Sequence, residues 1–548
     1  MRFLQTFWTG PNSVLKDDAL NMRAGWLSPE YHWISWALSC LQAKSIFGEI
    51  SLVTDKKGKE ILIDQLRLPY STVSMDLENR LDDYHPLLFA LAKIFTYSIQ
   101  TGPFLHLDSD VYFWRKPSAN LLNSALIAQN IDKNLPFYYQ TLNDINQHFN
   151  YIPAGFLREN YETKDLYASN AGIIGGNNPE FFEEYRRQAF EFIDKNKNDL
   201  GKFNAGRLNF IFEQYLFYLL ADKHNIPVAY LKDPVEDPIF KDYIKFDDFP
   251  DVQMIHPVGG FKQFPHVCDH LAKKLREDYP EYYYRVIELV RGVNDKMRSA
   301  VYYQSFFTPG KLPLAPAAKT ATLAATAPRF ERTKAGIRYL NGKYALNVDI
   351  DLANLPENMF AEKLTGLVQN DREKECLLEI FHMELAVNSL TAKLYADTLS
   401  TERLYEKDIR CYHKIQDTFL LAEAALMKIK LKAAETFAFI EPGWDWKYDR
   451  EEEIDALMQR NFNQEKDSFV VLLLPGVLQM NIREFYIDEL DAVIFDLLQH
   501  THPIGYILKE MEQYFSEDEI GEDYSSFKLL IIKTIKQLLY AGAIEIYL

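Results

Sequence analysis

Two aspartates close an apolar stretch in the segment FLHLDSD, residues 104–110. Side chains two positions apart in an extended strand point to the same face, so Asp108 and Asp110 can reach one divalent cation where the strand ends. A cation held by few protein ligands keeps positions open for the oxygen atoms of a diphosphate, whose charge it neutralises. The same spacing at 349–351 lacks the apolar strand, so the spacing alone leaves capping or solvated loop carboxylates as the alternative.

Three other segments carry residues that suit the same chemistry. Lys93 lies in an expected helix before the FLHLD strand, where its ammonium can meet a phosphate, although a lone lysine more often lies on a solvated face. The segment SNAGIIGG combines Asn170 with small residues such as Gly172 that allow a ligand to approach the backbone, or it is a strand edge with bulges. The segment HPVGGFK brings His256 and Lys262 within seven residues, enough for a third metal ligand and phosphate contacts, although a lone histidine is more often structural.

The elements that must position these residues alternate between short apolar runs and helical patterns. This alternation predicts an α/β domain with a largely parallel sheet, in which ligands collect at the carboxyl ends of the strands. In chain order we expect strands at 2–8, 49–54, 71–77, 104–108 and 125–130, and helices at 33–44, around Asp64 and at 86–100.

Composition divides the chain into four parts. Residues 1–300 carry the α/β pattern. Residues 301–335 are rich in alanine, proline and threonine, which predicts a linker. Residues 336–460 are expected to form a mostly helical connector, because helical spacing runs from Asp371 to Phe437 with almost no glycine or proline.

Residues 461–548 have the pattern of a small α+β unit. Two strand-like runs are divided by Pro475-Gly476, which is a hairpin signal, and Asp488 is placed to cap the helix that follows. The pattern predicts a winged-helix-like unit with strands at 468–474 and 478–487, helices that begin at 488 and cover 504–511 and 524–540, and a closing strand at 543–548.

Charge and cysteine usage restrict the partners. The chain has 60 basic and 78 acidic residues and a net charge of -18, which argues against nucleic acid or an anionic membrane as a partner. Its 4 cysteines are far apart and share no CxxC spacing, which argues against a disulfide framework and a thiolate zinc site and suits a reducing cytosol. No stretch approaches the roughly 20 apolar residues that span a bilayer, and we expect a cytoplasmic protein.

The order of the motifs resembles a known family. LAKIFTYSI, FLHLDSD, SNAGIIGG, Glu213-Gln214 and HPVGGFK follow one another as in metal-dependent glycosyltransferases of the GT-A fold, a Rossmann-like α/β fold. The stretch 1–291 most resembles the glycogenin-like family eight. The resemblance implies manganese or magnesium ligands at Asp108, Asp110 and His256, and contacts to the diphosphate of a nucleotide sugar, such as a UDP-sugar, at Lys93, Gly259 and Lys262.

The same resemblance implies roles at the sugar. Asn170 would contact the donor sugar, and Gln214 would lie beside the anomeric carbon. Glu213 stands where the family has aspartate, which puts the sugar contact at that position in doubt. The tryptophan-bearing end of the last motif is also missing. Thr6 and Trp8, at the end of the first strand, are placed to meet the nucleobase, although an aromatic residue there is as often part of the core.

The C-terminal pattern resembles the PqqD-like domains that recognise peptides in pathways that modify ribosomally made peptides. Such domains take a leader peptide as an added strand beside their hairpin, here within 478–487. A winged helix otherwise suggests DNA, but 468–548 has 5 basic and 13 acidic residues and would bind phosphates poorly. A structural cap or a dimerisation module is the alternative.

Together these features predict a metal-dependent glycosyltransferase that modifies a precursor peptide held by its leader on the C-terminal domain. Two alternatives stay open: a transferase that acts on a saccharide or lipid-linked acceptor, and a non-catalytic scaffold on a degenerate transferase fold. The sequence leaves the sugar, the acceptor residue and the oligomeric state undecided.

Overall fold

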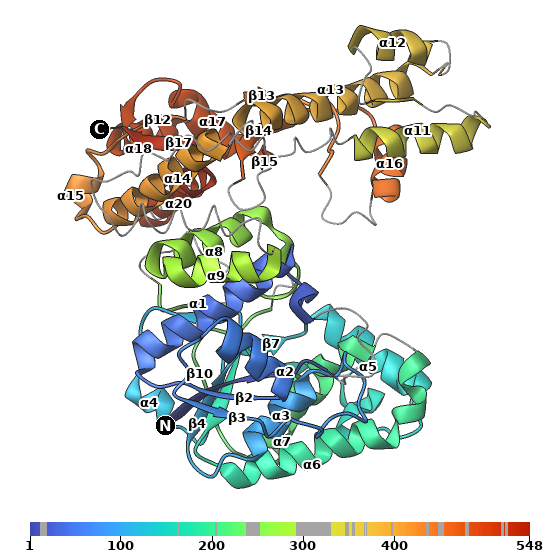
Figure 1. The fold of residues 1–548 in the computed structure, drawn as a ribbon, viewed down its shortest axis with the longest axis vertical. Coiled ribbons are helices and arrows are strands. Elements are labelled where there is room, and N and C mark those ends of the chain that lie inside the picture. Colours follow the sequence, from blue (N-terminus) through green and yellow to red (C-terminus); the bar gives the residue numbers. More distant parts are fainter. Residues whose placement is uncertain are drawn as a thin grey trace. The chain divides into compact units, whose positions relative to one another are not determined.

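The computed structural model describes residues 1–10, 19–161, 164–202, 205–236, 252–291, 330–345, 350–352, 357–365, 368, 370–395, 398–434, 438–447, 454–476, 482–516, 520 and 524–547. The chain separates into two compact units, the first formed by residues 1–246, 251–262 and 274–299 and the second by residues 247–250, 263–273 and 300–548 (Figure 1). Of the linker predicted at 301–335, only 330–335 lies within the described residues.

A seven-stranded sheet lies at the centre of the first unit. Its described strands are β1 (Arg2–Phe7), β2 (Ser51–Thr54), β3 (Thr72–Ser74), β4 (Phe104–Leu107), β6 (Leu126–Ala128), β9 (Ile173–Gly176) and β10 (Val228–Tyr230). The strand order is β10-β6-β9-β4-β1-β2-β3, in which β9 runs antiparallel to both its neighbours and the other pairs are parallel. The prediction of a Rossmann-like α/β domain with a largely parallel sheet is confirmed.

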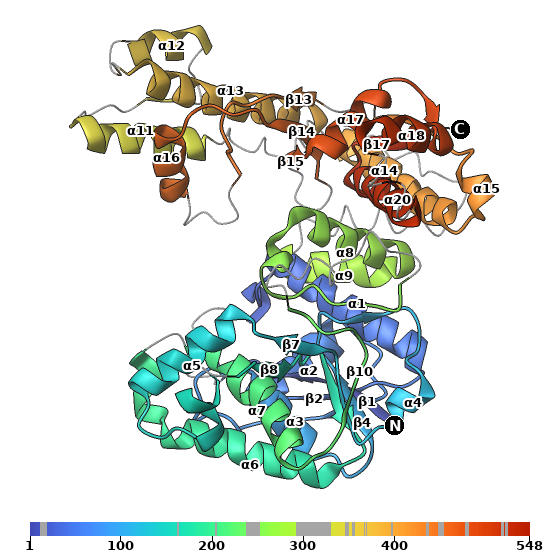
Figure 2. The same ribbon diagram turned by 180° about the vertical axis from the view of Figure 1, so that it is seen from behind.

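Helices cover both faces of this sheet (Figure 2). They include α1 (Pro29–Phe47) and α9 (Pro280–Arg291) on one face, and α3 (Ala90–Ser98), α6 (Pro179–Lys195) and α7 (Leu216–Lys223) on the other. Residues 30–43 of α1 are all buried, so this helix belongs to the interior although it carries several polar side chains. Those polar groups reach the carboxyl end of β4, where the predicted site residues lie.

The second unit combines helices with two three-stranded sheets. Its described helices are α11 (Glu331–Tyr344), α12 (Glu357–Thr365), α13 (Asp371–Leu394), α14 (Thr398–Phe419), α15 (Glu423–Leu426), α16 (Ile454–Asn463), α17 (Glu489–Leu497), α18 (Ile504–Met511) and α20 (Tyr524–Ala541). The strands are β12 (Lys430–Ala433), β13 (Ala438–Ile440), β14 (Val470–Pro475), β15 (Ile482–Ile487), β16 (His502–Pro503) and β17 (Ile544–Tyr547), in the orders β13-β14-β15 and β16-β12-β17.

The C-terminal elements follow the sequence pattern closely. Asp488 caps α17 through a capping box with Asp491, and Gly542 follows α20 with a φ of +82°, a conformation that glycine adopts without strain. β14 and β15 pair as the predicted hairpin, while residues 478–481 of the second predicted strand lie outside the described part of the chain. The three predicted helices and the closing strand are confirmed.

One prediction for the connector is wrong. The helical pattern expected from Asp371 to Phe437 ends earlier, because Lys430–Ala433 forms strand β12 between β16 and β17. Alternation in Lys-Leu-Lys-Ala buries Leu431 fully while the lysines face outward, which is the pattern of a half-buried strand. The sequence 430–433 is too short to display this period against the long helices before it.

Strand β14 is shared by two hydrophobic cores. Val471 and Leu473 pack among the helices α11, α13 and α16, whereas Leu472 and Leu474 pack among α14, α17, α18 and α20. Alternate residues of a strand point to opposite faces, so this one strand joins the connector helices to the C-terminal helices. The two groups of helices therefore belong to one compact unit.

Arg332→Met is expected to destabilise the second unit by about 3–5 kcal/mol, because it removes the guanidinium that offsets the charges of the buried Glu384 and the partly buried Glu484. The Arg332 side chain is buried, donates to Glu484 Oε2 at 2.8 Å and lies 3.6 Å from Glu384 Oε1. Burial opposes its charge, but Glu484 and Glu384 raise the pKa of Arg332. Urea unfolding followed by tryptophan fluorescence measures the loss.

A matched control lies on the same helix. Arg338 forms an ion pair with Asp455 at 3.6 Å, and both side chains are exposed. Arg338→Met should change the unfolding free energy by less than about 1 kcal/mol, since exposed ion pairs contribute little. Equal effects of the two substitutions would contradict the structural role of Arg332.

None of the helices among the described residues is both long enough and apolar enough to cross a bilayer.

Candidate functional site

The turn 108–111 after β4 is held by hydroxyl groups of α1 and by a neighbouring strand. Ser35 Oγ donates to the carbonyl of Ser109 at 2.9 Å, and Ser39 Oγ donates to a carbonyl of the same turn at 2.7 Å. The first amide of the turn donates to the carbonyl of Gly172 at 2.9 Å. Bonds from two directions therefore fix the backbone that carries both aspartates.

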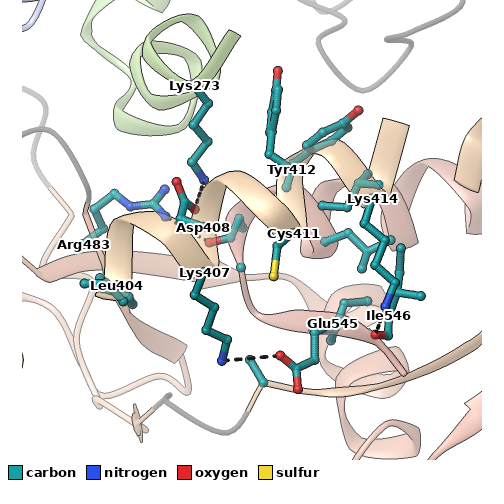
Figure 3. A pocket seen from close by; sticks show the side chains of 18 residues that line it. Lys273, Leu404, Lys407, Asp408, Cys411, Tyr412, Lys414, Arg483, Glu545 and Ile546 are labelled. Carbon is teal, nitrogen blue, oxygen red and sulfur yellow. Dashed lines mark hydrogen bonds and ion pairs between the residues drawn. The ribbon is translucent and has the colours of Figure 1, made fainter. Parts of the chain in front are cut away.

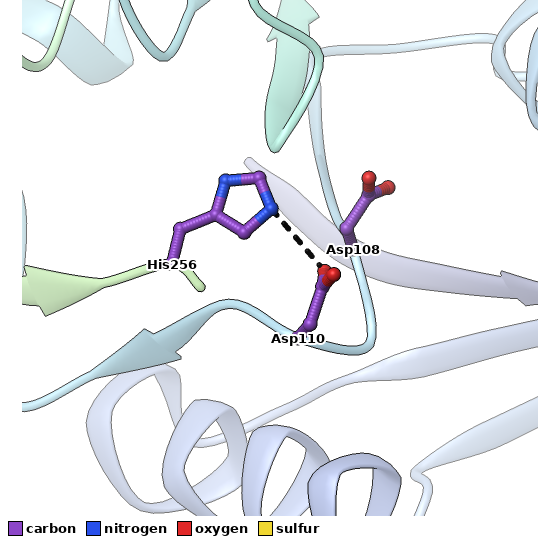
Figure 4. A group of neighbouring side chains, drawn as sticks. All are labelled: Asp108, Asp110 and His256. Atoms are coloured by element: carbon purple, nitrogen blue, oxygen red, sulfur yellow. Dashed lines mark ion pairs between the residues drawn. The ribbon is translucent and has the colours of Figure 1, made fainter. Parts of the chain in front are cut away.

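A pair of short strands brings a histidine to these aspartates. β5 (Tyr112–Phe113) pairs antiparallel with β11 (Met254–Ile255), which places His256 beside Asp110 with 3.4 Å between Nε2 and Oδ1. One ligand atom each from Asp108, Asp110 and His256 lies within 4.8 Å of the others (Figure 4). The three residues that the sequence singled out as metal ligands are thus brought together, and they could hold a divalent cation.

The His256 ring is oriented by a residue that the sequence analysis did not identify. Gln129 Oε1 lies 2.8 Å from His256 Nδ1, and because this oxygen can only accept, Nδ1 carries the proton. Gln129 Nε2 in turn donates to Asn130 Oδ1 at 3.3 Å. This bond fixes the plane of the ring with Nε2 directed toward Asp110, as second partners do for metal-binding histidines.

Gly172 is required by this packing. A Cβ added there would lie 2.2 Å from Gln129 Oε1 and 2.4 Å from His256 Nδ1. Both distances are far below van der Waals contact, so any larger residue would displace the ring. Gly172 therefore makes room for the side chains of Gln129 and His256, and a ligand contact at its backbone stays a prediction.

Lys262 contacts the second aspartate. Its Nζ forms an ion pair with Asp110, whose side chain is 9% exposed. Burial works against the charge of Asp110, but Lys262 and His256 hold the pKa of this carboxyl well below its usual range. Gly259 lies earlier in the same loop with a φ of +54° and open space around its α-carbon. The loop therefore delivers Lys262 to the aspartates without contact from Gly259 itself.

Lys93 lies between two carboxylates on the other side of the turn. Its Nζ is 2.9 Å from Asp108 Oδ1 and 2.7 Å from Glu213 Oε1, and all three groups are largely shielded from solvent. Burial opposes the lysine charge, yet Asp108 and Glu213 raise the pKa of Lys93. Burial also raises the pKa of Asp108, to about 6, although Lys93 opposes that shift. Tyr97 donates to Glu213 Oε1 at 3.2 Å, so Glu213 faces inward as the partner of Lys93.

A buried polar network extends from the metal group along the end of β6. Asn130 Nδ2 donates to Asp132 Oδ1 at 2.7 Å, and the side chain of Asn170 also bonds Asp132. Burial raises the pKa of Asp132 to about 6, although Tyr138, Asn130 and Asn170 stabilise its charge. Sequence reasoning identified Asn170 but missed Asn130, Asp132 and Tyr138. The polar pair Gln129-Asn130 directly after the apolar strand at 126–128 is the sequence feature from which these site residues could have been predicted.

Gln214 is tied into the same network. The hydroxyl of Tyr138 lies 2.5 Å from Gln214 Oε1 and 2.9 Å from Asp132 Oδ2. A hydroxyl carries one proton, so both contacts are hydrogen bonds at once only while Asp132 is protonated. The orientation of the Gln214 amide is therefore set by Tyr138.

Thr6 and Trp8 lie at the end of β1 with different surroundings. Thr6 Oγ1 is 3.0 Å from Nε2 of His106, which is buried two residues before Asp108. Trp8 is 8% exposed and lines a hollow of about 220 Å³ together with Asp55 and other residues. Thr6 is thus close to the aspartates, whereas Trp8 faces a separate concavity, and a nucleobase at this edge stays a prediction.

A hollow in the second unit is a poorer site. It measures about 110 Å³ and lies between α14, α20 and β17 (Figure 3). Its cations are already engaged: Lys273 is 2.8 Å from Asp408, Lys407 is 3.5 Å from Glu545, and Lys414 donates to a carbonyl of β17 at 2.8 Å. A charged ligand would have to displace these partners.

Gln129→Met is expected to lower manganese affinity about 10- to 100-fold, the usual cost of removing a group that orients a metal-bound histidine. The methionine keeps the volume of the side chain but cannot accept the bond from His256 Nδ1. Calorimetric titration of the full chain with Mn²⁺ measures the change. Gln188→Met, on the surface of α6, is the control. Equal affinities in the two variants would contradict this orientation of His256.

Comparisons with known proteins give a family. No curated protein matches the sequence. Residues 1–289 match the family described as a family of unknown function (DUF6734). This match includes the whole candidate site and more than half of the chain, and the protein therefore belongs to the DUF6734 family.

Proposed function

We propose that the first unit is a glycosyltransferase that uses a nucleotide-sugar donor together with Mn²⁺ or Mg²⁺. The observation that carries the proposal is the convergence of Asp108, Asp110 and His256 with two lysines at the carboxyl end of β4. Two carboxylates and an imidazole suit these cations. Lys93 and Lys262 add the positive charge that a diphosphate needs, so the donor set fits the predicted group.

The chemistry that such a site must perform is cleavage of the bond between the anomeric carbon and a diphosphate oxygen. The leaving group gains negative charge as this bond lengthens, and a bound cation supplies Lewis-acid stabilisation of that charge. Lys93 and Lys262 would contribute to the same stabilisation, which lowers the barrier because the charge develops in the transition state. Both ammonium groups now contact carboxylates. To bind the phosphate oxygens of the donor, they would have to turn away from these carboxylates.

Gln214 and Glu213 take different roles in this proposal. A carboxamide is a poor nucleophile, so Gln214 would position the sugar or stabilise positive charge at the anomeric carbon, in an orientation held by Tyr138. Glu213 is bound to Lys93 and Tyr97, which supports a role as the counter-ion of Lys93 rather than as a sugar contact. Asn170, bonded to Asp132, remains the proposed sugar contact.

The acceptor in this proposal is a precursor peptide whose leader binds the second unit, as in PqqD-like domains. The supporting observation is that β15 forms the edge of the sheet β13-β14-β15, with β14 as its only partner among the described strands. A peptide can add to such an edge through backbone hydrogen bonds. Tethering raises the effective concentration of the acceptor at the metal site without new contacts there.

Calorimetry with a panel of UDP-sugars and GDP-sugars, each with and without Mn²⁺, tests the function. A transferase should show manganese-dependent binding of one donor and transfer of its sugar to a peptide with a leader. A scaffold on a degenerate fold should show no metal-dependent heat. An enzyme that glycosylates free saccharides but ignores peptides would place the acceptor in another class.

A further inference from the structure

His32 lies on the face of α1 that holds the turn of the two aspartates. Helix positions separated by three, four and seven residues share a face, which aligns His32 with Ser35 and Ser39. Both serine hydroxyls bond the backbone of 108–111. Lys262 and Asp110 are the two charged groups that perturb the His32 ring. His32 therefore borders the candidate site on the side of Lys262.

The segment before α1 forms the wall on this side. The amide of Leu27 donates to the carbonyl of Lys262 at 3.1 Å, and Lys262 Nζ lies 5.8 Å from the centre of the Trp26 ring. A Cβ added at Gly25 would lie 3.6 Å from Lys262 Cδ. The stem of Lys262 is thus packed against this segment, which runs directly into the helical turn of His32, whose amide bonds the carbonyl of Ser28.

The His32 side chain is buried, and one of its two ring nitrogens has no hydrogen-bond partner among the described residues. It is 3% exposed, and its Nε2 is shielded from solvent with no hydrogen bond to the described residues. Burial, reinforced by Lys262, lowers the pKa of His32 to about 3, so the ring is neutral at neutral pH and carries one N–H and one lone pair. Its ring packs against Trp33 and Trp36, which fix its position. A buried nitrogen without a partner is unfavourable unless a ligand supplies one.

His32 stands beside the metal group rather than in it. The group whose ligand atoms lie within 4.8 Å of one another contains Asp108, Asp110 and His256. An imidazole on the α1 face that holds the turn 108–111, at the end of the segment that packs against Lys262, is placed to bind an anion that both Lys262 and the cation attract. A neutral N–H donor adds such a contact without adding a charge that Lys262 would repel.

We propose that His32 is a donor-binding residue, whose Nε2 hydrogen-bonds an oxygen of the diphosphate held between Lys262 and the cation. The inference rests on the proposed function, because that function brings a diphosphate to this place. It adds to the site a residue from α1, outside all the segments that the sequence singled out.

Calorimetric titration of the full chain with inorganic pyrophosphate at saturating Mn²⁺ tests this role, because pyrophosphate needs neither base nor sugar. His32→Phe should weaken pyrophosphate binding about 10- to 100-fold, the range for a lost hydrogen bond to a charged group. His32→Gln keeps an N–H donor and should stay within a few-fold of the unchanged protein. His224→Phe, on the half-exposed end of α7, is the control for a histidine on the same unit.

Titration with Mn²⁺ alone separates diphosphate binding from metal binding. His32→Phe should leave Mn²⁺ affinity unchanged, and a parallel loss of Mn²⁺ affinity would overturn the inference. Pyrophosphate binding by His32→Phe that equals that of the unchanged protein would also overturn it. If the unchanged protein shows manganese-dependent heat with neither pyrophosphate nor UDP, the proposed function fails and the inference fails with it.

Discussion

Asp110→Asn is expected to abolish manganese-dependent binding of the nucleotide donor. The carboxylate of Asp110 contacts both Lys262 and His256, and these two groups keep it ionised despite burial. An amide oxygen offers the same shape without the charge, so a divalent cation loses its main electrostatic partner. The loss should exceed the roughly 10- to 100-fold cost of an outer-shell substitution.

The measurement is calorimetric titration with UDP in the presence and absence of Mn²⁺. Asp64→Asn is the control, because Asp64 lies on the same unit in an exposed ion pair with Lys59. Binding of UDP that does not depend on manganese should be similar in all three proteins. Full manganese dependence in Asp110→Asn would remove the metal assignment, even with the fold intact in thermal melting.

The sequence predicted the first unit well because its strands are buried and its helices are long. A short apolar run such as 104–107 that stands between two helical patterns indicates a buried strand. The alternation of such runs with helices predicts a parallel sheet. The antiparallel strand β9 was not distinguished from its neighbours, because a buried strand reads the same in either direction. Strand β12 was missed because four residues with alternating burial carry less signal than the helices beside them.

The residues of the candidate site also fall into two groups, those that the sequence predicted and those that it missed. Asp108, Asp110 and His256 were found from motifs, and the structure brings them together. Gln129 and His32 were missed, because a single polar residue at a strand end or within a buried helix has no spacing that marks it. Their roles follow from the pairing of β5 with β11 and from the burial of α1, which are tertiary features.

The structure also changes how the second unit should be tested. A cut at Ser468 would remove β14, whose residues Val471 and Leu472 belong to two different cores. Such a truncation would remove the intended domain, and it would also expose the apolar faces of helices from α11 to α16. Loss of peptide modification after that cut would report unfolding as readily as loss of a leader site. A fragment of residues 1–299 omits β14 altogether and keeps the central sheet and every residue of the candidate site, while it carries 263–273 without the rest of the second unit.

The fragment of residues 1–299 is expected to retain manganese-dependent UDP binding but to lose most of its affinity for the precursor peptide. Removing a tether lowers the effective concentration of the acceptor, and the apparent KM for the peptide should rise about 10²- to 10⁴-fold. Initial rates with peptides that carry or lack the leader measure this. The intact chain with a leaderless peptide should behave like the fragment, and combining both deletions should cost no more than either one, because each removes the same interaction.

Additive losses from the two deletions would therefore contradict tethering, since independent effects require separate interactions. A second arm uses the intact chain, so that it does not depend on the folding of the fragment. Free leader peptide should compete with the full precursor and raise its apparent KM, while the binding of UDP and Mn²⁺ stays constant. A leader peptide that leaves the rate unchanged at high concentration would show that the acceptor reaches the metal site without the second unit, and the acceptor class would then have to be sought among substrates that carry no leader.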